Sequence, residues 1–159
     1  FPDKEALIEA LLVRMGSDIS KAFRARAEQV DIKRFGLREV VFYAITFGIN
    51  NIRTDPLVSE MVKNWNRLPI DKLLDPLEHF FLVMAQPYFL SNYQDYPIRT
   101  LEAKLYVVIN STLFTAIRYI HQDNPMVRET ELIETLTDMI VNLLEMQLRP
   151  VAPAPESRS

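Results

Sequence analysis

The sequence predicts an all-α domain built from six helices, and three observations support that prediction. Only three glycines occur in the 159 residues, and there is no Asn-Gly or Asp-Gly pair to form the tight turn of a β-hairpin. Prolines follow capping residues at Asp55-Pro56, Asp75-Pro76 and Asn124-Pro125, a pattern typical of helix starts. Apolar residues also recur at intervals of three and four, as they do on one face of a helix.

The first helix is expected to run from about Asp3 to Gln29. Asp3 is a suitable N-cap, and Glu5 lies in the first turn, where the helix dipole favours a negative charge. An apolar stripe then continues from Leu7 to Phe23 at helical spacing. These signals predict one long N-terminal helix.

The remaining helices follow from the same caps and stripes. Their expected ranges are about Gly36–Arg53, Pro56–Asn66, Pro76–Tyr96, Ile98–His121 and Arg128–Leu148. Pro87 is expected to kink or break the fourth helix, because it has no amide hydrogen to donate. The segment EVVFYAITF is rich in strand-forming residues, but its length and the helices around it favour a helix. Residues 1–149 would form one domain, followed by a disordered, proline-rich tail over residues 150–159.

Composition restricts the classes of function. The net charge is −3 at pH 7, whereas a protein that binds nucleic acid on its own usually carries a basic face. The chain has no cysteine, which excludes disulfides and thiolate metal sites and fits a cytoplasmic protein. Its longest uncharged runs are near fifteen residues, short of the roughly 20 that a membrane-spanning helix needs.

No arrangement of side chains in the sequence points to catalysis or metal binding. The two histidines, His79 and His121, belong to different predicted helices without carboxylates at metal-ligand spacing. Three scattered glycines cannot form a phosphate-binding loop. We therefore expect that the protein is not an enzyme and needs no cofactor.

Three helical stretches are free of charge, namely Val40–Ile52, Phe80–Gln94 and Leu105–Ile117. A helix that is apolar on most sides must be buried on most sides, yet a domain of this size has few central positions. Two explanations fit. The helices either surround an internal cavity for an apolar or aromatic molecule, or bury one face against a second subunit. Plain core packing is the alternative for any single residue.

The sixth predicted helix carries a broad apolar stripe that favours dimerisation. Together with the nearly apolar fifth helix it would form half of a four-helix bundle, which a second copy of the chain would complete by two-fold symmetry. The alternative is packing within one chain alone. The predicted interface residues are Val108, Thr112, Leu132, Leu136, Met139, Ile140, Leu143 and Leu144.

The first residues, FPDKEALIEALL, resemble the junction in TetR/AcrR-family transcription regulators where a DNA-binding helix-turn-helix passes into the long fourth helix. Phe1, Asp3, Lys4, Glu5 and Leu7 match the family pattern F-x-D/N-K-E-x-L. The predicted helix order is also similar, with one long helix first and two strongly apolar helices last.

The resemblance implies the regulatory domain of a transcription repressor. Residues 1–5 would end the linker from a helix-turn-helix domain that this chain does not include. Lys4 matches a family position that often contacts a DNA phosphate. The implied partners are a second copy of the chain, a small hydrophobic effector, and operator DNA reached only through the missing domain, with no membrane contact. Effector binding would swing the first helix and change the spacing of two DNA-binding heads.

Helical position and the family layout together select the residues expected to contact the effector. They are Tyr43, Phe47, Asn50, Trp65, Phe80, Met84, Tyr88, Asn110 and Phe114. Two other functions fit the same sequence. The chain would instead be a carrier or sensor of an apolar molecule with no DNA role, or a helical adaptor whose apolar surfaces meet a partner protein.

Overall fold

A computed structural model describes residues 3–30, 34–146 and 149–150, and it confirms the all-α prediction. Its α-helices are α1 (Lys4–Val30), α2 (Leu37–Thr54), α3 (Pro56–Lys63), α4 (Asp71–Asn92), α5 (Ile98–Ile120) and α6 (Glu129–Glu145). A 3-10 turn, η2 (Trp65–Arg67), lies between α3 and α4. Two short strands, β1 (Tyr93–Gln94) and β2 (Arg149–Pro150), pair antiparallel.

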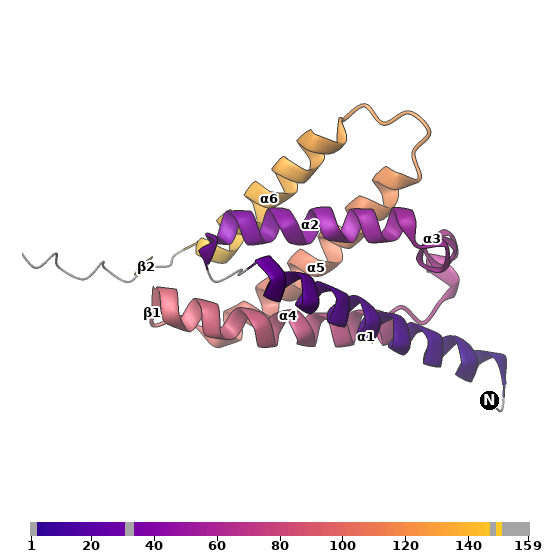
Figure 1. Cartoon of the computed structure of the whole chain (residues 1–159), viewed down its shortest axis with the longest axis horizontal. Coiled ribbons are helices and arrows are strands. Elements are labelled where there is room, and N and C mark those ends of the chain that lie inside the picture. The colour runs from indigo at the N-terminus through magenta and orange to yellow at the C-terminus, as the bar shows by residue number, and fades with distance from the viewer. Residues whose placement is uncertain (1–2, 31–33, 147–148, 151–159) are drawn as a thin grey trace, which may run out of the picture.

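Two pairs of helices make the frame of the fold (Figure 1). α1 packs along α4, and α2 packs along α6. α5 contacts α4, α2 and α6, and so joins the two pairs. The N-terminal turns of α1 project beyond the other helices, as the indigo ribbon in Figure 1 shows.

Gly16 brings α1 close to α4. A Cβ atom at this position would lie 3.2 Å from the carbonyl oxygen of Leu73 on α4, closer than most side chains tolerate. Around this crossing, Leu12 and Met15 of α1 are buried in one cluster with Leu73 and Leu77 of α4. A glycine inside a helix lowers helix stability, and at position 16 the close approach of the two helices explains it.

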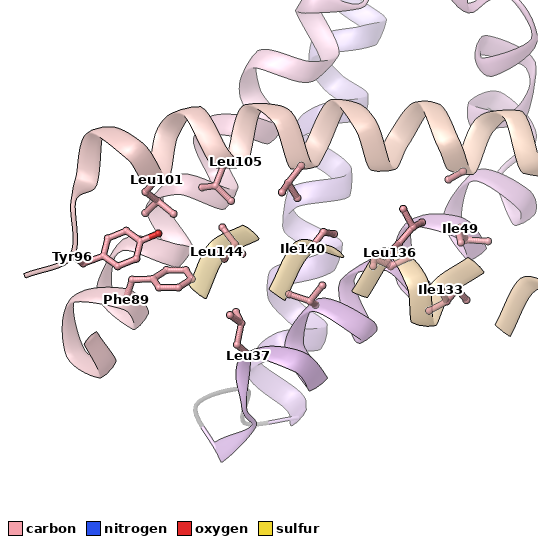
Figure 2. Close-up of a cluster of buried hydrophobic side chains, with 14 residues drawn as sticks. Leu37, Ile49, Phe89, Tyr96, Leu101, Leu105, Ile133, Leu136, Ile140 and Leu144 are labelled. Atoms are coloured by element: carbon pink, nitrogen blue, oxygen red, sulfur yellow. The ribbon is translucent and has the colours of Figure 1, made fainter. Parts of the chain in front are cut away.

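Apolar contacts and ion pairs join α2 to α6. In Figure 2, Ile133, Leu136, Ile140 and Leu144 of α6 lie in a row between α5 and α2. The Arg38 Nη2 atom on α2 lies 2.5 Å from a Glu134 carboxylate oxygen and 2.9 Å from one of Asp138, and Arg53 pairs with Glu129 at 2.5 Å. Because these pairs are largely exposed, each contributes little, and the apolar row supplies most of the contact energy.

Two of the predicted helix caps are confirmed. The amide of Ala6 donates to Asp3 Oδ1 at 2.7 Å at the start of α1. At the start of α3, Asp55 Oδ1 accepts hydrogen bonds from the amides of Leu57 at 2.9 Å and Val58 at 3.3 Å. These side chains satisfy amides that have no partner within the helix.

The predicted start of the fourth helix is wrong. α4 begins at Asp71, so Pro76 lies inside it, as does Pro87, and the helix continues to Asn92. Its first turn is tightened by a bond from the amide of Leu73 to the carbonyl of Ile70 at 2.9 Å. That turn starts the helix ahead of Asp75-Pro76, whose sequence carries the same signal as a true cap.

Most other boundaries lie within one residue of the expected ones, but α3 ends at Lys63 and not Asn66, and α4 ends at Asn92 and not Tyr96. α6 begins at Glu129, so Asn124-Pro125 lies in the loop before it and not at a helix start. Most of the tail predicted to be disordered, residues 151–159, lies outside the described residues, while Pro150 pairs with Tyr93. Within the described ranges, no helix is long and apolar enough to cross a membrane.

Candidate ligand-binding cavity

Among the residues that the structure describes, buried side chains form three clusters. The first joins α2, α5, α6 and the end of α4, and contains Ile49 and Ile140. The second joins α1, the end of α2, α3 and the start of α4, and contains Leu12. The third contains Phe23 of α1 and Phe80 of α4, with partly buried aromatic rings packed against them. Side chains do not completely fill the space between these three clusters.

An apolar cavity of about 300 Å³ lies between the three clusters, and each of the helices α1 to α6 contributes to its wall. That volume is at the lower end of the range for small-molecule sites. An apolar protein cavity of about 150 Å³ already holds benzene, so this one has room for a molecule of two rings.

Phe23 connects α1 to the aromatic part of the cavity wall. Its ring centroid lies 5.6 Å from that of Phe47 on α2 at an interplanar angle of 78°. On α4 it lies 5.5 Å from Phe81 and 6.1 Å from Phe80, again edge to face. Such geometry is favourable for aromatic pairs. A ligand that enters here meets the rings that fix α1 to α2 and α4.

Gly48 forms an open part of the wall on α2. It lies on the same helix face as Ala44, Ile45 and Ile52, all of which line the cavity. A Cβ atom at position 48 would have no other atom within 4 Å, in contrast to Gly16. Close packing therefore does not require this glycine, and its absent side chain leaves room in the cavity.

Polar side chains are few in the wall: Ser20, Asn51, Tyr88 and Thr112. The Ser20 hydroxyl donates to the Gly16 carbonyl at 2.7 Å. Burial raises the pKa of Tyr88, so its hydroxyl stays neutral. The hydroxyl of Thr112 is buried and has no partner. Among the described residues of the wall, none carries a charge at neutral pH, so the cavity suits a neutral molecule.

The structure brings four of the predicted effector-contacting residues together in the wall: Phe47, Phe80, Met84 and Tyr88. Tyr43 packs behind it, with its ring centroid 5.8 Å from that of Phe23. Asn50 is exposed on α2, whereas its neighbour Asn51 lines the cavity and is half-buried.

The other three predicted contact residues lie elsewhere. The Asn110 amide donates to a Glu78 carboxylate oxygen and to the Tyr106 carbonyl, each at 2.8 Å. Trp65 packs edge to face on Phe114, with ring centroids 5.2 Å apart, and neither residue is among those lining the cavity.

The residues predicted for the dimer interface differ in how deeply they are buried within a single chain. Val108, Leu136, Ile140 and Leu144 are buried in the core, and all but Leu136 also line the cavity. Leu132 and Leu143 are partly buried against the first cluster. Thr112 lines the cavity, and Met139 is 42% exposed. A second chain can therefore reach Met139 most directly.

A second, more open hollow of about 410 Å³ lies between α4 and α5. Its acidic side chains are Asp75, Glu78 and Glu102, with His79 beside them. The described residues contain no group of three such side chains that could hold a metal ion. The apolar cavity is therefore the better candidate for a functional site.

Comparison with known proteins assigns no family, because no family model, no curated protein and no solved structure matches the chain.

Proposed function

We propose that the chain is the regulatory domain of a TetR-like transcription repressor in the cytoplasm, not an enzyme. A small apolar or aromatic effector would bind in the cavity and control DNA binding by an N-terminal helix-turn-helix domain. The observation that carries the proposal is the uncharged cavity to whose wall each of the helices α1 to α6 contributes. Its wall includes α1, the helix that begins at the TetR-like sequence junction.

The position of Phe23 suggests how effector binding would reach the DNA-binding domain. Phe23 lines the cavity and packs on rings of α2 and α4, while Lys4 is exposed at the other end of the same helix. An effector that displaces these rings would move α1 as a rigid element. It shifts the equilibrium only if it binds the displaced conformation more tightly.

The proposed repressor is a homodimer that pairs through α5 and α6. Besides Met139, the exposed apolar residues Val107 and Phe114 lie on α5, seven positions apart and so on one helix face. Glutamate in place of Met139 is expected to convert the dimer to a monomer in sedimentation velocity. The control is Met126→Glu, at a fully exposed loop position, which should leave a dimer intact. Equal behaviour of the two variants would contradict this interface.

The repressor role is tested on the intact protein by selecting DNA from a random library. The expected result is enrichment of a palindrome with two half-sites, bound through a helix-turn-helix upstream of residue 1. The absence of a helix-turn-helix upstream, or of any sequence selection, would contradict the proposal. A carrier or sensor of an apolar molecule would then be the better explanation of the cavity.

A further inference from the structure

The hydroxyl of Thr112 is both buried and unpaired, unlike six other hydroxyls on the helices. Those of six residues donate to the carbonyl oxygen one turn earlier, at 2.6–2.8 Å: Ser20, Thr46, Thr54, Ser111, Thr135 and Thr137. Thr112 has the carbonyl of Val108 at the corresponding position, but its Oγ1 atom makes no such bond and is shielded from solvent.

An unpaired buried hydroxyl is unfavourable, and native proteins rarely keep one without a reason. The neighbours of Thr112 on the α5 part of the wall are Val108, Ile109 and Ala116, whose side chains offer no hydrogen-bond partner. A water molecule held there would need two or more polar partners. The hydroxyl is therefore best satisfied by a polar atom of a molecule that fills the cavity.

Other features of the wall define that molecule further. The hydroxyl of Ser20 already has a protein partner. Among the wall residues that the structure describes, none would compensate a charge, and an ionised group transferred into such a site is strongly disfavoured. The cavity of about 300 Å³ accommodates two rings.

We infer that the ligand is a neutral, two-ring-sized apolar compound with one oxygen, a hydroxyl or a carbonyl, that hydrogen-bonds Thr112. This inference rests on the proposed ligand-binding function. Because a threonine hydroxyl both donates and accepts, either oxygen group is suitable. A carboxylate of the same size is excluded by its uncompensated charge.

Equilibrium dialysis with 1-naphthol and naphthalene tests the inference, since the two probes differ by one hydroxyl. Thr112→Val keeps the shape of the side chain and removes its hydroxyl. It is expected to weaken 1-naphthol binding roughly three- to tenfold, the value of one hydrogen bond, and to leave naphthalene binding unchanged. Thr115→Val, at an exposed position on the same helix, is the control and should change neither affinity.

The outcomes separate this inference from the proposed function. If Thr112→Val leaves the ratio of the two affinities unchanged while wild type binds both probes, the inference is overturned and the cavity remains a ligand site. If wild type binds neither probe, the cavity fails as a ligand site and the inference fails with it. Binding of 1-naphthoate as tight as that of 1-naphthol would overturn the requirement for a neutral ligand.

Discussion

Phenylalanine in place of Gly48 is expected to weaken binding of two-ring ligands strongly while the chain stays folded. An apolar cavity of about 150 Å³ already holds benzene, so a phenyl ring at position 48 would take up a large part of the cavity of about 300 Å³. The added ring is buried among apolar groups, so it should not unfold the protein. Equilibrium dialysis with 1-naphthol is expected to show a tenfold or greater loss of affinity, about 1.4 kcal/mol or more.

Alanine at the same position provides the matched control. Because a Cβ atom at Gly48 meets open space, Gly48→Ala should retain 1-naphthol binding and raise the free energy of unfolding by about 0.5–1 kcal/mol. Gly16→Ala should lower the free energy of unfolding, because its Cβ would press on the Leu73 carbonyl. Undiminished 1-naphthol binding by Gly48→Phe would show that the ligand does not occupy this cavity.

Alanine in place of Phe23 is expected to lower the free energy of unfolding by about 3–5 kcal/mol. Phe23 is 3% exposed and its ring packs against those of Tyr43, Phe47, Phe80 and Phe81. Its removal would enlarge the existing cavity and take away the aromatic contacts that hold α1 to α2 and α4. Urea unfolding followed by circular dichroism measures the change.

The comparison for this variant is Phe35→Ala, at a ring that is 42% exposed just before α2. It should lose less than half as much stability, because much of its ring already contacts water. Similar losses for the two variants would mean that Phe23 does not link the helices as described.

Helix positions were largely predictable from sequence because caps and periodicity are local signals. Asp3 and Asp55 cap the helices as expected. Asp75-Pro76 has the same signature as Asp55-Pro56, yet it lies inside α4. The difference arises from the tightened turn at Ile70 and Leu73, which capping patterns do not describe.

The cavity wall was only partly predictable from the sequence. When a helix is apolar on all sides, its sequence does not indicate which face lines a cavity. Each residue turns the side chain by about 100°, so Asn50 is exposed while Asn51 lines the cavity. Thr112 was assigned to the predicted interface, and its unpaired hydroxyl is visible only in three dimensions. Gly48 did carry a sequence signal, since a glycine in the middle of an apolar helix is unfavourable without a structural reason.

Native mass spectrometry of the wild-type chain, incubated with 1-naphthol, tests most directly whether the cavity holds a small neutral molecule. The expected result is a complex with one 1-naphthol per chain that denaturation releases, and whose amount falls sharply in Gly48→Phe. A wild-type spectrum that shows only the bare protein at saturating 1-naphthol would contradict the cavity as a binding site.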